Sequence, residues 1–214
     1  MNRRVQGRHC QRYAGDPTIS SSESTLSKPQ LRTKLRALRR SFSQRKQSEA
    51  ASLTADHAQT LLQWHSAKKI AIYLNADGEL RTEAIIQAAL AQNKQIYLPV
   101  IGPKRSLSFA QWVVGQSLVP NTLGINEPNA SASRCLIEAL DILFLPLVAW
   151  DKRGNRLGMG GGYYDRALSG VSGPAIIGLA HSEQEVETVP RQSWDIVLDA
   201  VLTEQGIHHC LKEC

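Results

Sequence analysis

The stretch KIAIYLNADGELRTEAIIQAALAQNKQIYLPV, residues 69–100, decides the fold class because its hydrophobic period changes twice. KIAIYLN (Lys69–Asn75) and KQIYLPV (Lys94–Val100) are short runs rich in β-branched and aromatic residues, which is typical of strands. Between them, TEAIIQAALAQ (Thr82–Gln92) carries apolar residues at helical spacing. The stretch therefore predicts a β-α-β unit.

The alternation of helices and strands continues on both sides of this unit. Upstream, Leu31, Leu35 and Leu38 recur at helical spacing, and a second helical stretch runs from about Gln47 to Trp64. Downstream, a helix is predicted near Tyr163–Leu168. Further strands are predicted at LSFAQWVV (Leu107–Val114), DILFLPLVAW (Asp141–Trp150), PAIIGLAH (Pro174–His181) and DIVLDAVLT (Asp195–Thr203).

Nearly continuous apolar strands that alternate with helices indicate a sheet buried on both faces. We therefore expect an α/β fold with three α-β-α layers, a mostly parallel, Rossmann-like sheet and two N-terminal helices. Residues 28–214 are predicted to form a single α/β domain. Residues 1–27 are polar, Ser-rich and basic without periodicity, and are predicted to be a disordered tail.

The net charge of +6 is concentrated at the N-terminus. Residues 1–40 hold ten Lys and Arg, leaving 15 of the 25 basic and 17 of the 19 acidic residues for the rest of the chain. A basic tail is compatible with nucleic-acid binding, but a solvated tail is the simpler interpretation. Because the body is nearly neutral, we expect no nucleic-acid partner.

No segment of the sequence predicts a membrane partner or secretion. The apolar run Ile142–Trp150 is much shorter than the roughly 18–20 residues of a membrane span, and the basic N-terminus lacks the apolar core of a signal peptide. A zinc site within HHCLKEC is an alternative to free thiols in a reducing compartment. The cysteines are scattered along the chain, at Cys10, Cys135, Cys210 and Cys214, which indicates free thiols. We expect a cytoplasmic monomer.

The stretch RLGMGGGYYDR (Arg156–Arg166) is the strongest candidate for a ligand site. Glycines let a ligand approach the main chain, so that successive N–H groups converge on an anion just before a helix begins. The stretch lacks the Lys and hydroxyl of a Walker loop, and Tyr163 breaks the GxGxxG pattern. A phosphate cradle of another kind and a structural tight turn are the two interpretations.

The wider window LPLVAWDKRGNRLGMGGGYYDRAL (Leu145–Leu168) closely resembles the signature of 5-formyltetrahydrofolate cyclo-ligases, also called 5,10-methenyltetrahydrofolate synthetases. The resemblance implies a ligase of one-carbon metabolism that uses MgATP to convert 5-formyltetrahydrofolate into 5,10-methenyltetrahydrofolate, ADP and phosphate, through a phosphorylated formyl intermediate. It spans about Lys28 to Thr203. Three flanking motifs share it: KPQLR (Lys28–Arg32), YLNADGELRT (Tyr73–Thr82) and VPRQSWDIVLD (Val189–Asp199).

The resemblance also implies roles for individual residues. Arg156 is the implied catalytic cation, because a planar guanidinium pairs with phosphate oxygens in a bidentate way. Asp165 and Asp195 are the implied Mg²⁺ ligands, since magnesium prefers hard oxygen donors. Residues implied to bind ATP are Lys28, Arg32, Arg156, Leu157, Gly158, Met159, Gly160, Gly161, Gly162, Tyr163 and Tyr164. Residues implied to bind the folate are Leu74, Glu79, Met159, Gly160, Gly161, Gly162 and Tyr163.

Several of these residues have simpler interpretations that stay open. Lys28 and Arg32 lie four apart and share one helical face, yet a merely basic helix surface has the same pattern. Arg156 is also compatible with a solvated turn charge, and Asp165 with a first-turn helix charge. Asp195 is compatible with a strand-end acid, and Glu79 with a loop acid. Asp151 and Asp199 are interpreted as turn and strand-edge residues.

The window departs from the family pattern at two positions. Met159 stands where many members have Arg, which removes a cation and leaves more of the charge stabilisation to Arg156 and Lys28. Trp150 stands where the family often has Phe, which keeps an aromatic wall. Two other functions stay open: a nucleotide- or RNA-binding module that uses the basic N-terminal segment, and a phosphotransferase acting on another small molecule.

Overall fold

The computed structural model describes residues 26–122 and 124–210. Most of the predicted tail lies outside these residues. Ser27 is the N-cap of α1 (Lys28–Arg40), and its backbone N–H donates to Gln30 Oε1 over 2.9 Å. The helix predicted over Gln47–Trp64 is interrupted: α2 spans Gln44–Gln59 and α3 spans Leu62–Ser66. Leu61 takes extended backbone angles between them, which lets its side chain become buried.

The central sheet has eight strands in the order β12-β11-β10-β7-β1-β2-β3-β6. The five strands from β11 to β2 are parallel, whereas β12, β3 and β6 pair antiparallel at the two edges. The mostly parallel α/β fold is thus confirmed. The strands are β1 Lys69–Ala71, β2 Gln95–Ile101, β3 Leu107–Trp112, β6 Arg134–Cys135, β7 Ile142–Pro146, β10 Ala175–Leu179, β11 Ala200–Thr203 and β12 Gly206–His209.

The predicted β-α-β unit is present. Strands β1 and β2 pair in parallel, with Ile70 opposite Ile96, and α4 (Glu83–Ala91) connects them. The predicted helix at Tyr163–Leu168 is α5. Short elements complete the described chain: the ladder of β4 (Leu118–Pro120) with β5 (Asn126–Pro128), the hairpin of β8 (Ala149–Trp150) with β9 (Arg156–Leu157), and three 3₁₀ turns at Pro103–Arg105, Ile137–Ala139 and Ser182–Gln184.

Three sequence predictions about strands were incomplete. LSFAQWVV forms β3, but antiparallel to β2, because the link of residues 102–106 is far shorter than a parallel crossover needs. The strand predicted over Asp141–Trp150 ends at Pro146, and Ala149–Trp150 turns away to form the β8–β9 hairpin. The segment before Ala200 is not part of β11. For β7 and β11, the hydrophobic run is longer than the segment that pairs in the sheet.

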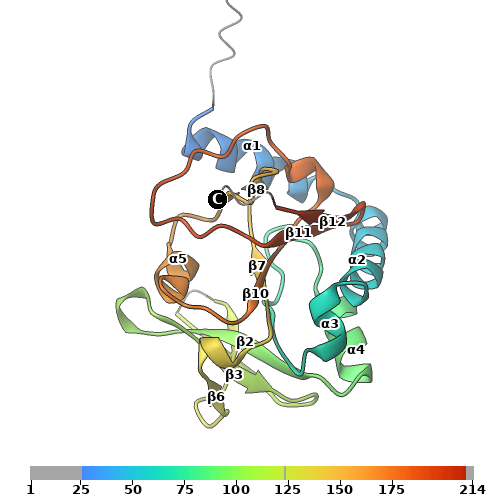
Figure 1. Cartoon of the computed structure of the whole chain (residues 1–214), viewed down its shortest axis with the longest axis vertical. Coiled ribbons are helices and arrows are strands. Elements are labelled where there is room, and N and C mark those ends of the chain that lie inside the picture. Colours follow the sequence, from blue (N-terminus) through green and yellow to red (C-terminus); the bar gives the residue numbers. More distant parts are fainter. Residues whose placement is uncertain (1–25, 123, 211–214) are drawn as a thin grey trace, which may run out of the picture.

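Helices cover both faces of the sheet (Figure 1). On one face α2, α3 and α4 bury a cluster that includes Trp64, Ile85 and Phe144. On the other, α5 and the β8–β9 hairpin bury Leu145, Trp150 and Leu168. The helix α1 packs Leu31 and Leu35 on Val148, Ala149 and Leu157, at one end of the sheet. In addition to the three layers, α1 therefore covers the ends of the strands.

The described helices include none that is both long and apolar enough to cross a membrane.

Candidate active site

A cavity of about 890 Å³ lies beyond the carboxyl ends of β1, β2 and β7. This is the place where ligands bind in open α/β sheets. Its walls are the first turns of α1, the loop after β1, the glycine run after β9 and the start of α5. Every residue predicted to be in the site lines this cavity: Lys28, Arg32, Leu74, Glu79, Arg156, Leu157, Gly158, Met159, Gly160, Gly161, Gly162, Tyr163, Tyr164, Asp165 and Asp195.

The glycine run, Gly158–Gly162, connects β9 to α5 and is held by α1. Arg32 Nε donates to the carbonyl oxygen of Gly158 over 2.8 Å. Gly160 has a φ of +95°, which is strained for residues with a side chain, and a Cβ added there would lie 3.4 Å from Arg32 Cζ. Gly160 therefore serves both the backbone turn and the close approach of a cation.

Replacing Gly160 by alanine is expected to lower the free energy of unfolding by about 1–2 kcal/mol, the usual cost of left-handed angles for a residue with a Cβ. The new methyl would make an ordinary van der Waals contact with Arg32, so the cost should come from the backbone angle and not from a clash. Chemical denaturation measures this effect, with Gly158→Ala as the stability control, since a Cβ added at Gly158 meets no atom within 4 Å. Equal stability of the two variants would contradict the role given to the turn.

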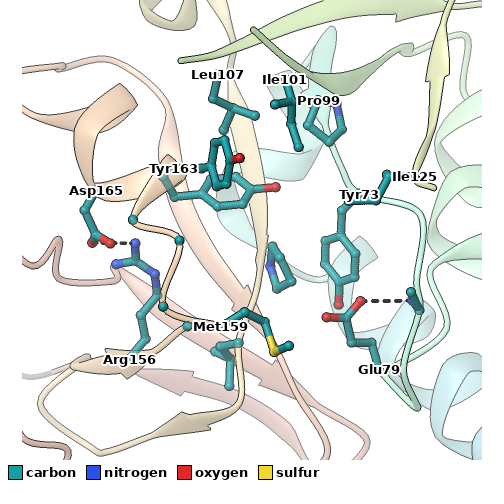
Figure 2. A pocket seen from close by; sticks show the side chains of 18 of the residues that line it. Tyr73, Glu79, Pro99, Ile101, Leu107, Ile125, Arg156, Met159, Tyr163 and Asp165 are labelled. Atoms are coloured by element: carbon teal, nitrogen blue, oxygen red, sulfur yellow. Dashed lines mark hydrogen bonds and ion pairs between the residues drawn. The ribbon is translucent and has the colours of Figure 1, made fainter. Parts of the chain in front are cut away.

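Arg156 and Asp165 form an ion pair on the glycine side of the cavity (Figure 2). Arg156 Nη2 lies 2.8 Å from Asp165 Oδ1, and Arg156 Nη1 donates to the carbonyl oxygen of Ile196 over 2.5 Å. The Arg156 side chain is only 5% exposed, so it is not a solvated turn charge. Asp165 also accepts from the N–H of Ile196 over 3.2 Å, which fixes both groups against the loop before β11.

Lys28 and Asp195 form a second pair at the same wall. Their Nζ and Oδ2 atoms lie 3.0 Å apart, and the same oxygen accepts from the N–H of Gln192 over 2.8 Å. Partial burial opposes ionisation of Asp195, but the hydrogen bonds from Gln192 and Lys28 lower the pKa of its carboxyl overall. The first residue of α1 is therefore positioned against an ionised carboxylate.

Glu79 faces the glycine run from the opposite wall (Figure 2). The preceding Asp77 and Gly78 have positive φ angles and form a tight turn, closed by a 2.8 Å hydrogen bond from the Glu79 N–H to the Ala76 carbonyl oxygen. The Ala76 N–H in turn donates to Glu79 Oε2 over 3.0 Å. Burial raises the pKa of Glu79, although the Ala76 hydrogen bond and the positive charge of Arg39 oppose this.

Arg39 fixes this loop, and it was not predicted from the sequence. Its buried guanidinium donates to the carbonyl oxygens of Asp77 and Leu147 and to Asp77 Oδ2, and lies 3.5 Å from Glu79 Oε1. Partial burial raises the pKa of Asp77, but hydrogen bonds from Arg36, Arg39 and a third arginine lower it overall, well below the usual range. In the sequence Arg39 is one cation among several in a basic helix, so nothing there distinguishes it.

The remaining wall of the cavity is apolar and was also missed. Pro99, Ile101 and Leu107 come from β2 and β3, and Ile125 lies near the start of β5 (Figure 2). Trp194, 67% exposed, lines the cavity beside Asp195. The rule that sites lie at the carboxyl ends of parallel strands would have identified Pro99 and Ile101. It would not have identified Leu107, which is in an antiparallel strand, or Ile125, which precedes one.

Among the described residues, no group of three or more His, Cys, Asp and Glu side chains is arranged to hold a metal ion. The zinc alternative in HHCLKEC also required Cys214, which lies outside the described residues. Asp165 and Asp195 both line the cavity and offer two carboxylates. Magnesium usually takes only one or two protein carboxylates and completes its shell with phosphate and water.

Comparisons with known proteins agree with one another. The model of the 5-formyltetrahydrofolate cyclo-ligase family matches residues 24–204. The 5-formyltetrahydrofolate cyclo-ligase of Haemophilus influenzae is 41% identical over 184 residues, which cover 84% of this chain and 98% of the relative. That of Escherichia coli K12 is 38% identical over 178 residues, with coverages of 81% and 98%. The structure of the Aquifex aeolicus 5,10-methenyltetrahydrofolate synthetase gives a TM-score of 0.77 at 30% identity, with coverages of 87% and 94%.

Proposed function

Because this chain belongs to the 5-formyltetrahydrofolate cyclo-ligase family, we propose that its cavity holds both substrates of that reaction and that they meet at the glycine run. The reaction is the ATP-dependent cyclisation of 5-formyltetrahydrofolate to 5,10-methenyltetrahydrofolate, with release of ADP and phosphate. The observation that carries the proposal is that distant parts of the chain come together around this cavity. Segments as far apart as Lys28 and Asp195, 167 positions along the chain, line one cavity.

The chemistry requires activation of a formamide, whose oxygen is a poor leaving group. In our proposal the formyl oxygen attacks the γ-phosphorus of ATP and ADP leaves. N10 of the folate then attacks the formyl carbon, the bond from that carbon to the phosphorylated oxygen breaks, N10 loses its proton and phosphate departs. The protein contributes by aligning the two substrates and by stabilising the charge that develops on the transferred group.

Three cations on the glycine side are suited to that charge. Lys28, Arg32 and Arg156 line one wall of the cavity, and hydrogen bonds to Asp195, Gly158 and Asp165 hold them in position. Such preorganised donors need little rearrangement as the reaction proceeds. Arg32 lies against Gly160, next to Met159. We propose that Arg32 supplies the positive charge that is missing because position 159 is Met and not Arg. We assign Arg156 the catalytic role because it is the most buried of the three.

The donors at this wall also fit a magnesium ion. Asp165 uses Oδ1 and Asp195 uses Oδ2 for the hydrogen bonds described above, so each has a second oxygen outside those bonds. We propose that these two carboxylates hold Mg²⁺ together with the phosphates of ATP. When bound there, the ion supplies further positive charge to the phosphate oxygens.

The opposite wall suits the folate. The Glu79 carboxylate is an acceptor for the paired N–H donors of a pterin ring, and Leu74 lies close to it in the chain. Ile101, Leu107 and the ring of Tyr163 gather on one side of the same cavity and offer an apolar surface (Figure 2). This arrangement would direct the formyl group toward the phosphates.

A coupled assay tests this function. Purified protein is incubated with 5-formyltetrahydrofolate and ATP, and the methenyl product, followed by its near-ultraviolet absorbance, is compared with ADP release. We expect equal amounts of both, dependent on Mg²⁺. ADP without methenyl product would indicate a phosphotransferase with another acceptor. Neither product, together with salt-sensitive RNA binding, would favour a nucleic-acid-binding module.

The monomeric state, the cytoplasmic location and the division into a tail of residues 1–27 and one domain of residues 28–214 stay predictions.

A further inference from the structure

The Tyr73 hydroxyl lacks a hydrogen-bond partner although it is buried. Within residues 26–122 and 124–210 the other buried side-chain atoms in this condition are Gln47 Oε1, Thr54 Oγ1, Trp150 Nε1 and the two ring nitrogens of His181. Of these residues only Tyr73 lines the cavity. Buried polar groups are nearly always satisfied, because an unmet donor costs about 1–3 kcal/mol. An unmet donor at a ligand cavity therefore indicates that the ligand supplies the acceptor.

The position of Tyr73 is fixed by its surroundings. It lies two residues after the end of β1, its ring belongs to the main hydrophobic cluster, and the residue is 4% exposed. The fully buried Thr82 anchors its main chain, with Thr82 Oγ1 donating to the Tyr73 carbonyl oxygen over 2.9 Å. The ring therefore has little freedom to seek another partner, and the hydroxyl stays directed at the place it now faces.

That place is next to the Glu79 carboxylate. Tyr73 points its hydroxyl toward Glu79 in Figure 2, yet the two are not hydrogen-bonded to each other. Burial, and then the negative charge of Glu79, raise the pKa of Tyr73 well above its usual range, so the phenol stays protonated and serves as a donor. A donor and a carboxylate thus lie side by side at one wall of the cavity.

We propose that Tyr73 binds the folate directly, by donating a hydrogen bond from its hydroxyl to the C4 carbonyl oxygen of the pterin ring. This inference rests on the proposed function, in which Glu79 accepts from the ring's 2-amino group and N3–H. In a pterin the C4 carbonyl is the next group along the same edge. Two donors and then an acceptor on the ligand match a carboxylate and then a hydroxyl on the protein.

The consequence is selectivity for a 4-oxo ring. A site built to hydrogen-bond a particular group strongly rejects analogues that lack it, because its own polar atom is then left unpaired. A 4-amino pteridine presents a donor where the 4-oxo ring presents an acceptor. The Tyr73 hydroxyl would meet it only by turning its own proton away and accepting, which gives up the hydrogen bond that it donates to the 4-oxo ring.

Tyr73→Phe removes the hydroxyl and keeps the ring. We expect the KM for 5-formyltetrahydrofolate to rise about tenfold, as for the loss of one hydrogen bond, with the KM for ATP unchanged. Stability should not fall, because an unpaired polar group has been removed. The matched control is Tyr97→Phe: Tyr97 is also buried, but its hydroxyl donates to Gln95 Oε1 over 3.1 Å and it is not among the cavity residues. That variant should keep its folate KM.

A double-mutant cycle distinguishes direct contact from an effect through Glu79. The dissociation constants of 5-formyltetrahydrofolate and of its 4-amino analogue are measured for the wild-type protein and for Tyr73→Phe, without ATP. The analogue also lacks N3–H, but that loss affects both proteins, so the cycle isolates the hydroxyl. We expect the preference for the 4-oxo ligand to fall about tenfold in Tyr73→Phe. An unchanged preference would overturn the inference, whereas a wild-type protein with no cyclo-ligase turnover would overturn the proposed function instead.

Discussion

Arg156→Ala is expected to lower kcat for methenyl formation at least 100-fold. Removing one preorganised donor from a site that stabilises transition-state charge typically costs a factor of about 100–1,000. Arg156 is buried, is aligned by Ile196 and Asp165, and lies beside the glycine run. Asp165→Ala should have a comparable effect, because it would remove both a proposed metal ligand and the partner that orients Arg156. Steady-state kinetics at saturating ATP and folate measures both.

The matched control is Lys152→Ala, which deletes a cation from the turn between β8 and β9. The Lys152 side chain is 77% exposed and lies 3.6 Å from Glu185, and the residue is not one of those lining the cavity. Its turnover should equal that of the wild-type protein. Thermal unfolding of Arg156→Ala should stay cooperative, since Asp165 is 26% exposed and its carboxylate would retain contact with water. Near-normal turnover in Arg156→Ala and Asp165→Ala would refute the site assignment.

Glu79→Gln is expected to lower kcat/KM for 5-formyltetrahydrofolate about 100-fold while the KM for ATP stays unchanged. A carboxylate accepts from two N–H donors at once, whereas an amide offers one acceptor and one donor, and hydrogen bonds to charged groups contribute about 1.5–3 kcal/mol each. Glu79 lies across the cavity from Arg156 (Figure 2), so its effect should be confined to the folate. Glu49→Gln, on an exposed position of α2, is the control.

The pH dependence provides an independent test of Glu79. Its pKa is raised by burial, so protonation begins at a higher pH than for an exposed glutamate. Because only the ionised form accepts from both pterin donors, folate affinity of the wild-type protein should fall as pH decreases through that raised pKa. The Glu79→Gln variant should lack this loss. Titration of folate affinity against pH in the two proteins decides the point, and a parallel loss in both would contradict the role of Glu79.

The β-α-β unit and α5 could be predicted from sequence because each is defined by a local hydrophobic period. The end of β7 could not be predicted, since the apolar residues continue through Leu147 and Val148 into a different sheet. The direction of β3 depended on the length of a link, not on the apolar pattern of the strand. Parallel strands were predicted best where a helix separated them.

The site residues also divide into those that could be predicted from the sequence and those that could not. Residues in contiguous motifs, such as Arg156 and Asp165, could be proposed from sequence, and they line one cavity. Arg39 and Tyr73 could not, because their importance depends on burial. A buried guanidinium that joins Asp77 to Leu147 looks like any other arginine of α1 in the sequence. A hydroxyl without a partner, as on Tyr73, becomes visible only when the surrounding chain is in place.

The most direct test of the central claim, that the formyl oxygen meets the γ-phosphate of ATP in this cavity, is an isotope measurement. The protein is incubated with MgATP and 5-formyltetrahydrofolate that carries ¹⁸O in its formyl group, and the phosphate released is analysed by mass spectrometry. Our account predicts one ¹⁸O atom in each phosphate, because the formyl oxygen departs with the transferred phosphoryl group. Unlabelled phosphate formed together with methenyl product would contradict it.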